Sequence, residues 1–452
     1  MKKQVCVLLV LLTCFFLPAA AFAADGEINV QLNGANLQLQ DAAPVNEEGR
    51  VYVPFRAVFE ALGATVAYDK ESDTITAQKG DTAVQFVIGS TDITVDGKQV
   101  TTDAASFVRD GRTYVPVRFA AQSLGVTVGW DAARQTVVMV DKAALKEAAK
   151  GQYTLMEKYM VYSESFNKEP MAIKGTLKFD LQVADGSGAD AVMIPVTGTM
   201  KLDGLSTAEI ASMNVATELD LNQLEKAIAQ AGEMTEEDKR VMEQLQSFDM
   251  DVIANMETGK VYMKSALFGL SCMDGTAWYM MDLEQMLQGS GMDLQTLLES
   301  TSRQDSYEAV VMSMIDGLPV TDALTCATML ESINQYQDKN FQKVGSNYVS
   351  TLKQETEGIS VAVSLTLKTD GDKVTGYAQS MSMYMGTAQI MTMKIEQSGN
   401  QATMNVEMNV DGMMTMKMNG DMRYTATAEK PQGAPASGDK VIDLMEQLNQ
   451  VA

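Results

Sequence analysis

The strongest constraint on the fold of this chain is a segment that occurs twice. Residues 111–131 (GRTYVPVRFAAQSLGVTVGWD) repeat residues 49–69 (GRVYVPFRAVFEALGATVAYD) at a constant offset of 62 residues, and 11 of the 21 aligned positions are identical. A duplication of this kind builds one supersecondary unit twice, and neighbouring copies bury their apolar faces against each other. We therefore expect a domain of two repeats over residues 27–142.

Each repeat carries the signals of a strand, a short helix and a hairpin. In the second copy, Pro116 ends a strand because it has no N–H to donate, and its fixed φ suits the first turn of a helix. Gly125 suits the left-handed residue that follows the end of a helix. The predicted elements are a strand at 114–115, a helix over 117–124, strands over 126–130 and 136–140, and a preceding hairpin that turns at Asp96-Gly97.

The paired YVPxR and LG segments resemble the copper amine oxidase N-terminal-like domain, also called the stalk domain, of secreted proteins from Gram-positive bacteria. The resemblance implies a small antiparallel sheet curled against one helix in each copy. Copper amine oxidases hold their metal on histidines and form a quinone from Tyr in an Asn-Tyr-Asp/Glu setting. This chain has no histidine, and its Asn347-Tyr348 is followed by Val349, so we expect the module without its catalytic domain and with no cofactor.

The first 23 residues have the pattern of a signal peptide. Lys2 and Lys3 precede an apolar run over residues 5–17, and Ala21-Phe22-Ala23 gives the small-x-small pattern before a cleavage. Cys14 raises the alternative of lipidation, but Thr13 is a poor residue before a lipidated cysteine. We expect export without lipidation, to the exterior or cell envelope of a Gram-positive-type bacterium, with a cell-wall component as a candidate partner. No other run reaches the ~20 apolar residues of a membrane span.

The composition disfavours several classes of function. A formal net charge of −24 makes nucleic acid and anionic membranes poor partners. The lack of histidine excludes Ser-His and Cys-His nucleophiles and the usual catalytic zinc sites, so we expect no enzymatic activity and no metal. After loss of the signal peptide only Cys272 and Cys326 remain, and the sequence leaves open whether they form a disulfide.

A second domain, expected over residues 153–428, follows a short helical connector over residues 143–152. Between Ile173 and Val183 apolar and polar residues alternate with a period of two, which specifies a strand with one wet face. The alternation indicates a large antiparallel meander with turns at Asp370-Gly371, Ser398-Gly399 and Asp411-Gly412. It recurs over residues 250–256, 359–367, 381–385, 391–395, 404–410 and 414–418.

Helical patterns interrupt this meander over residues 221–246 and within residues 281–340, around DLEQMLQ, DLQTLLES and DALTCATMLESINQYQ. A sheet with one apolar face must cover it, so we predict an α+β fold: two small sheet-plus-helix repeats, then a large half-barrel sheet covered by helices. Residues 429–452 are predicted to form a linker and a C-terminal amphipathic helix that docks on the sheet. The second domain resembles the lipoprotein-carrier family that includes LolA and the LppX type, which implies a half-barrel that shelters a lipid.

Methionine is the most unusual feature, with 34 residues and Met-x-Met triples at 381/383/385 and 414/416/418. Three thioethers on one face of a strand could hold Cu(I), although such sites normally recruit His or Cys as well. Methionine could also simply fill a solid core, in which case the protein is a purely structural component of the envelope. The hypothesis we favour is an adaptable apolar surface that binds a lipid-like ligand. Its predicted wall is Met250, Met263, Leu365, Met383, Met393, Met408 and Met416, or their alternates on the same strands.

The repeated arginines give a further expectation. Arg56 and Arg118 each precede an aspartate, Asp69 and Asp131, by 13 residues, which suggests one structural ion pair in each repeat. The alternative is that these arginines recognise a carboxylate or a phosphate, which exposed arginine favours.

Overall fold

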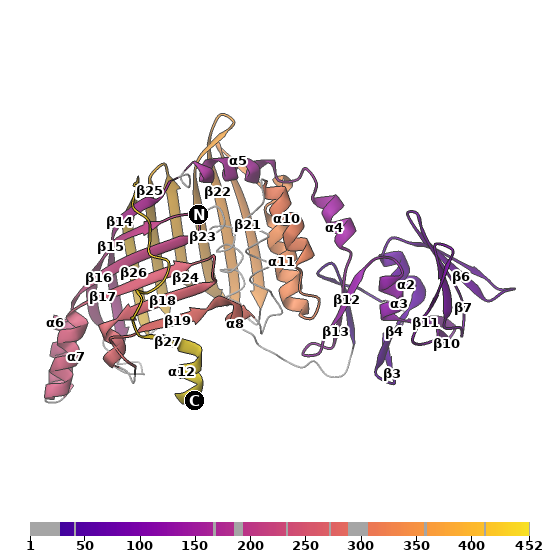
Figure 1. Ribbon diagram of the computed structural model, residues 1–452, viewed down its shortest axis with the longest axis horizontal. Coiled ribbons are helices and arrows are strands. Elements are labelled where there is room, and N and C mark those ends of the chain that lie inside the picture. Colours follow the sequence, from indigo (N-terminus) through magenta and orange to yellow (C-terminus); the bar gives the residue numbers. More distant parts are fainter. Residues whose placement is uncertain are drawn as a thin grey trace.

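The computed structural model describes residues 28–39, 42–165, 169–184, 193–231, 234–270, 273–287, 306–356, 359–410 and 413–451. The predicted signal peptide, Cys14, Cys272, the turn at 411–412 and the DLQTLLES helix lie outside these residues. The fold is α+β: small sheets with short helices come first, and a 14-stranded sheet with flanking helices follows (Figure 1). None of the described helices is long and apolar enough to cross a membrane.

The two copies of the duplicated segment fold alike. In each, a strand ends at a proline, Pro54 or Pro116, that stands directly before a short helix. The glycines after these helices, Gly63 and Gly125, have φ of +83° and +72°, a conformation in which a Cβ would be strained. The elements are β4 (Arg50–Pro54), α2 (Phe55–Ala61), β5 (Thr65–Asp69) and β6 (Thr74–Lys79), matched by β11 (Arg112–Pro116), α3 (Val117–Gln122), β12 (Thr127–Asp131) and β13 (Thr136–Val140).

The repeats meet along one strand pair. In the antiparallel β4–β11 pair, Val53 lies opposite Val115, and these two residues are also equivalent by the 62-residue offset. The pair therefore has a local twofold axis between the repeats. Both valines are fully buried and join Phe59 in one core cluster, so neither repeat has a separate core.

The first strand of the chain completes the sheet of the second repeat. β1 (Asn29–Leu32) pairs in parallel with β13 in a sheet of order β12-β13-β1-β2. The corresponding sheet of the first repeat continues from β6 through a meander whose last hairpin turns at Asp96-Gly97, as the sequence predicts. The remaining strands are β2 (Ala35–Asn36), β3 (Val45–Glu47), β7 (Thr82–Val87), β8 (Asp92–Val95), β9 (Lys98–Thr101) and β10 (Phe107–Arg109).

The predicted Arg56–Asp69 and Arg118–Asp131 ion pairs are wrong. Arg56 Nη1 contacts Glu60 Oε1 at 3.3 Å, one turn further along α2. Asp69 instead accepts hydrogen bonds from Ser72 Oγ at 2.7 Å and from the N–H of Glu71, which closes the β5–β6 turn. Asp131 pairs with Arg134 in the equivalent turn, so each aspartate organises its own hairpin.

The duplicated unit and the second domain share a hydrophobic core. β13 is buried on both faces, and Val138 and Val140 on its outer face join the cluster formed by helices α4 (Lys142–Ala149), α5 (Thr154–Glu164), α10 (Tyr307–Asp316) and α11 (Ala323–Gln335). The contact is close at Gly129, where an added Cβ would lie 2.1 Å from the carbonyl oxygen of Val320. The two parts of the chain are therefore packed against each other and are not independent domains joined by a flexible linker.

The large sheet is almost entirely antiparallel. Its strand order is β20-β21-β22-β23-β24-β25-β26-β14-β15-β16-β17-β18-β19-β27, so the last long strand pairs with the first, and only β27 joins in parallel. Gly371 and Gly399, at φ of +59° and +56°, make two of the predicted turns. The strands are β14 (Met171–Ala184), β15 (Met193–Ser206), β16 (Ile210–Asp220), β17 (Ser247–Asn255), β18 (Lys260–Ser265), β19 (Trp278–Asp282), β20 (Gln342–Val344), β21 (Asn347–Thr356), β22 (Ile359–Asp370), β23 (Lys373–Met385), β24 (Ala388–Ser398), β25 (Gln401–Val410), β26 (Met414–Ala426) and β27 (Val441–Asp443).

Two further helices and the C-terminal segment complete the domain. α6 (Asn222–Ala231) and α7 (Glu236–Gln246) follow β16, and Thr235 begins α7 with a capping box closed by Asp238. The chain after β26 crosses the sheet, held where Asn255 Nδ2 donates to the carbonyl of Gly433 at 2.9 Å. It ends in α12 (Leu444–Val451), which contacts β19 as predicted for a docked helix. The short helix α8 (Leu283–Leu287) follows β19.

Candidate binding surface on the methionine-rich sheet

The strand register separates the large sheet into two faces of opposite chemistry. Residues directly opposite each other across paired strands point to the same face. One such row runs from Met383 on β23 to Met391, Met408 and Met416 on the next three strands and continues to Leu181 on β14. These cross-strand methionines form a continuous apolar strip. We call the face of the sheet that carries this strip the methionine face. It includes every second residue of each strand, namely those whose side chains point to the same side as the strip.

The next row confirms the pattern on the same strands. Met381 lies opposite Met393, followed by Val406, Met418 and Phe179. A third row joins Leu365 to Ile395 and Met404 through Gln379. The triples predicted from the sequence therefore merge into one surface because the register of four successive strands is in phase.

All seven predicted wall residues have the parity of the methionine face, but they do not form one patch. Met383, Met393, Met408 and Met416 lie together on β23 to β26. Met250 pairs with Val215 and Met263 with Val252, on strands β16 to β18, with β14 and β15 between them and β26. Leu365 is 1% exposed in the core beneath α11, so it supports the surface from one edge.

Sequence reasoning left several residues of this face out of the predicted wall. Phe179, Ile395 and Val406 lie in the same rows as the predicted methionines, and their strands alternate as clearly. The signal that could have found them is strand parity, once the pairing of β26 with β14 is known. That pairing joins positions 240 or so residues apart, and no local pattern in the sequence specifies it.

The opposite face of the sheet is polar and charged. Lys368 and Lys394 both contact the carboxylate of Glu396, with Lys394 Nζ at 2.8 Å. The hydrogen bonds from these two lysines, Lys368 first, lower the pKa of Glu396 to about 2. The C-terminal segment also lies on this side, where the N–H of Gln432 donates to Ser212 Oγ at 3.2 Å. This is therefore the outer face of the sheet.

Four glycines allow the sheet to curl around the methionine face. Gly175, Gly198, Gly204 and Gly420 lie on β14, β15 and β26 with the parity of that face. A Cβ at any of them would stand 2.2 to 2.7 Å from a carbonyl oxygen of the neighbouring strand. Glycine at such positions marks tight bends of a curved sheet. Figure 1 shows the result, because β14 to β18 run steeply across the direction of β21 to β23 within one continuous sheet.

Helices cover the two margins of the methionine face. At one margin α11 is fixed to the sheet because Ser350 Oγ donates to the carbonyl of Gln335 at 2.7 Å, and Gln335 Nε2 donates to the carbonyl of Val363 at 3.3 Å. Burial between α5 and the sheet raises the pKa of Tyr377, whose ring meets Tyr159 edge-on at 5.5 Å. At the other margin, α6 and α7 pack against Val196, which is buried, and against Leu181 and Leu219, which are partly buried.

Between these margins the apolar side chains keep contact with solvent. Met381 is buried at the edge of the helical cover, whereas its neighbours further into the face are only partly buried. A hollow of about 340 Å³ lies on β24 to β26. Its lining combines Met391, Met408 and Met416 with residues of outer-face parity such as Thr392, Glu407 and Lys417, so it does not belong to the methionine face alone. The partly buried residues are Met383, Met391, Met393, Ile395, Met404, Val406, Met408, Met414, Met416 and Met418.

The surface consists mainly of thioether and aliphatic side chains. Among the described residues there is no group of three or more His, Cys, Asp or Glu that could hold a metal ion. The thioethers are soft, polarisable and conformationally adaptable, so the surface can accommodate varied apolar shapes.

Comparison with known proteins bears on the first part of the chain. Residues 31–139 match the copper amine oxidase N-terminal domain. The match spans both repeats, and it agrees with the resemblance carried by the YVPxR and LG segments. No curated protein sequence matches the chain.

Solved structures give only weak similarity to the large sheet. An outer membrane lipoprotein-sorting protein domain from Vibrio parahaemolyticus is 10% identical, with 60% of this chain and 93% of that chain covered and a TM-score of 0.21. Lipovitellin is 8% identical over 61% of this chain and 26% of its own, at a TM-score of 0.18. A porin of Rhodopseudomonas blastica is 8% identical, with 56% of this chain and 100% of the porin chain covered and a TM-score of 0.12. At these TM-scores none of the three carries an argument about this chain.

Proposed function

We propose that this chain is a non-enzymatic binding protein that holds a lipid-like molecule against its methionine face. The observation that carries the proposal is a concave apolar surface whose central side chains stay partly exposed between two helix-covered margins. Apolar surface of this extent is unfavourable in water, and large exposed apolar patches mark binding sites. The polar outer face and the net charge of −24 keep the rest of the molecule soluble.

The energetics favour a ligand with a long hydrocarbon chain. Each buried methylene contributes about 0.8 kcal/mol, so a chain of about a dozen methylenes gains roughly 10 kcal/mol before the entropic cost of association. Methionine side chains can follow the shape of such a chain, since they are unbranched and have three rotatable bonds. The mechanism requires burial alone and no reaction.

The decisive experiment is titration of the full chain with a fluorescent fatty acid. The test variant is Met408→Asp, which places a carboxylate on the methionine face, and its matched control is Asn405→Asp, on the same strand but on the outer face. We expect Met408→Asp to weaken binding at least about tenfold, because ligand burial would desolvate the new charge. Asn405→Asp should bind as the parent does.

Circular dichroism of both variants keeps the result interpretable, since both must retain the parent's spectrum. If the parent binds neither the fatty acid nor lipids extracted from its host, the proposal is wrong and the purely structural role stands. Equal weakening by the two substitutions would equally contradict a site on the methionine face.

The proposal places the protein outside the cytoplasm, with the duplicated domain directed toward the cell envelope. It is supported by the basic start, apolar run and Ala21-Phe22-Ala23 of the sequence. Intact-mass measurement of the exported protein tests it, with a mature chain starting near Ala24 as the expected result. A diacylglycerol-modified Cys14 at the N-terminus would show a lipoprotein instead.

A further inference from the structure

The rows of methionines give way to uncharged polar side chains at one end of the methionine face. Tyr377 on β23 lies directly opposite Gln397 on β24, and Gln379 lies beside Tyr377 on the same strand and the same face. Tyr424 on β26 has the same parity, and its backbone N–H donates to the carbonyl of Asn400 at 2.9 Å, in the hairpin that follows Gln397. We call the side chains of Tyr377, Gln379, Gln397 and Tyr424 the polar end.

The two phenols of the polar end lie close to each other. Tyr377 is only 7% exposed, because its ring packs edge-on against Tyr159 of α5 at 5.5 Å. Burial raises the pKa of Tyr377, and the phenols of Tyr424 and Tyr162 raise it further. An electrostatic effect of one phenol on another requires short separations, so Tyr377 and Tyr424 border the same space. Both phenols remain neutral hydrogen-bond donors at physiological pH.

Most of the polar end has no hydrogen-bond partner within the protein. No residue that the structure describes makes a hydrogen bond with the side chain of Tyr377, Gln379 or Tyr424. Gln397 is 3% exposed, and its Nε2 donates to the carbonyl of Gly399 at 3.4 Å. Hydroxyl and amide groups lose free energy when a ligand displaces their water without replacing its hydrogen bonds. A ligand that covers this end must therefore bring hydrogen-bonding groups of its own.

The methionine face carries almost no charge. In sheet order from β21 to β19, none of the described strands places an Asp, Glu, Lys or Arg with the parity of this face. Lys343 on the short edge strand β20 shares the parity, but it is exposed and lies over the ring of Tyr348 at 5.7 Å. The buried residues of α5 are uncharged as well: Leu155, Met156, Tyr159, Met160 and Ser163. An ionised head would therefore lose water at the polar end without gaining a counter-charge.

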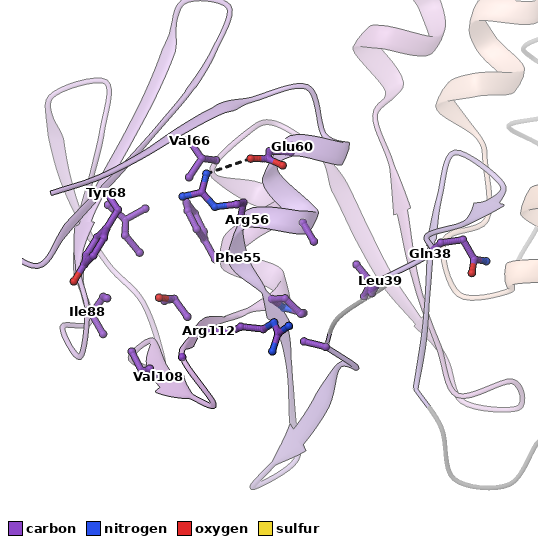
Figure 2. A pocket seen from close by; sticks show the side chains of 16 residues that line it. Gln38, Leu39, Phe55, Arg56, Glu60, Val66, Tyr68, Ile88, Val108 and Arg112 are labelled. Atoms are coloured by element: carbon purple, nitrogen blue, oxygen red, sulfur yellow. Dashed lines mark hydrogen bonds and ion pairs between the residues drawn. The ribbon is translucent and has the colours of Figure 1, made fainter. Parts of the chain in front are cut away.

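A cleft in the first repeat has the opposite chemistry. It lies beside α2, and its lining includes Arg56 and Glu60, whose side chains contact each other at 3.3 Å (Figure 2). Both side chains are more than half exposed, so water solvates their charges. The polar end differs on both counts, because its groups are neutral and Tyr377 and Gln397 are buried.

We infer that the lipid held by the methionine face has an uncharged, hydrogen-bonding head that lies at the polar end. This specificity rests on the proposed function and gives the ligand a direction. The hydrocarbon tail runs along β23 past Met381 and Met383, about 13 and 20 Å from Tyr377 at about 3.3 Å per residue. Phenols donate to a carbonyl, and the glutamine amides both donate and accept, so an acylglycerol, with its ester and hydroxyl groups, matches this set.

The test is displacement of the fluorescent fatty acid from the full chain at pH 8 by two competitors with the same acyl chain. These are 1-monolauroylglycerol, whose head is uncharged, and laurate, whose head is ionised, each kept below the concentration at which it forms micelles. We expect 1-monolauroylglycerol to bind at least about tenfold more tightly than laurate, because only the carboxylate loses solvation without a partner.

Conservative variants locate the head. Tyr377→Phe removes the hydroxyl and keeps the ring against Tyr159, and Gln379→Leu removes the amide at similar volume. Each should weaken 1-monolauroylglycerol about three- to tenfold, the value of one hydrogen bond, and leave laurate bound at least as well as before. Tyr384→Phe is the matched control, because Tyr384 lies on the same strand with the parity of the outer face, and it should change neither affinity. Circular dichroism should show the parent's spectrum for all three.

The possible failures are distinguishable. If the parent binds neither the fluorescent fatty acid nor either competitor, the proposed function is wrong and the head specificity falls with it. If the parent binds lipid but takes laurate as tightly as 1-monolauroylglycerol, the lipid site stands and the uncharged head is wrong. If Tyr377→Phe and Gln379→Leu change affinity no more than Tyr384→Phe does, the head does not lie at the polar end. Met408→Asp should weaken both competitors, since it alters the surface along the tail.

Discussion

Asp131 and Ala323 join the two parts of the chain across 192 residues of sequence. The N–H of Ala323, the first residue of α11, donates to Asp131 Oδ2 at 2.9 Å. Arg134 Nη1 reaches the same carboxylate at 3.0 Å and also Asp322 Oδ1 at 3.3 Å. Burial alone would raise the pKa of Asp131, but the hydrogen bonds from Ala323 and Arg134 outweigh it and lower the pKa. The aspartate is therefore ionised at the joint between the duplicated domain and the helix that covers the methionine face.

This joint predicts a difference between equivalent residues of the two repeats. We expect Asp131→Ala to lower the free energy of unfolding by about 2 to 3 kcal/mol, because it leaves buried donors without their acceptor. Asp69→Ala is the matched control and should cost about 0.5 kcal/mol, since Asp69 only closes an exposed turn. Urea unfolding at pH 7 measures both. Equal costs would show that Asp131 does not hold the two parts together.

The sign of the pH dependence follows from the lowered pKa. A carboxyl whose folded pKa lies below its unfolded value contributes stability above the unfolded pKa, and loses it as pH falls through the folded pKa. The cost of Asp131→Ala should therefore be full at pH 7 and shrink below about pH 4.

Gly129 predicts a steric effect at the same interface. Its added Cβ would lie 2.1 Å from the backbone oxygen of Val320, which cannot yield as a side-chain tip could. Gly129→Ala should therefore destabilise the chain by about 1 to 3 kcal/mol, although alanine stands at the equivalent position, Ala67, of the first repeat. The control Ala67→Gly should cost under about 1 kcal/mol. Thermal unfolding compares the two, and a stabilised Gly129→Ala would contradict the close packing.

Much of this fold can be predicted from the sequence, because short local patterns specify where its helices, strands and turns begin and end. Pro116 and Gly125 bracket a helix as expected, and period-two alternation locates the long strands. The duplication also explains why Val53 and Val115 meet. These inferences succeed because they depend on backbone preferences of a few adjacent residues.

What the sequence could not predict is long-range. The closure of the second repeat by β1, the pairing of β26 with β14, and the burial of Leu365 beneath α11 all depend on contacts between distant segments. The wrong ion pairs of Arg56 and Arg118 have the same cause, because spacing along the chain does not give the direction of an exposed side chain. One missed clue was local: β13 reads TVVMV without alternation, which is typical of a strand buried on both faces.

Cys326 gives a chemical prediction. The structure has it as a free, fully buried thiol, and burial raises its pKa to about 11. Because the thiolate is the reactive form, we expect Cys326 to resist alkylation at pH 8 in the folded protein and to react fully in urea. Peptide mapping after alkylation without reductant reads out the site. A Cys326 that stays unlabelled in urea would show a disulfide, for which Cys272 is the candidate partner.

Substitution of Glu396 should change the stability of the fold without changing ligand affinity. Its pKa of about 2, lowered by Lys368 and Lys394, means that its carboxylate contributes stability at neutral pH that is lost between about pH 4.5 and 2. Because the side chain is 33% exposed, solvent screening limits the contribution, and we expect Glu396→Gln to cost only about 1 kcal/mol at pH 7. Urea titrations at pH 7 and pH 3 should show the difference shrinking. Fatty-acid affinity should not change, since Glu396 lies on the outer face.

The methionine face should be sensitive to oxidation if it binds by apolar contact. Mild peroxide converts accessible methionines to sulfoxides, which are polar and would interrupt the surface at Met383, Met393, Met408 and Met416. We expect peroxide to lower fatty-acid affinity at least about tenfold. The matched variant replaces these four methionines with leucine, which keeps volume and apolarity at a cost under about 1.5 kcal/mol each.

The leucine variant should bind the fatty acid in its untreated form and keep more of that binding after peroxide than the parent does. It also separates the apolar hypothesis from the copper one, because leucine has no sulfur to coordinate Cu(I). Retained fatty-acid binding in this variant means that methionine serves the surface through shape and adaptability. If the variant instead loses the fatty acid while remaining folded, binding needs a property of methionine that leucine lacks, and the role of shape and apolarity alone is wrong. If oxidation leaves the parent's affinity unchanged, the methionine side chains do not line the ligand.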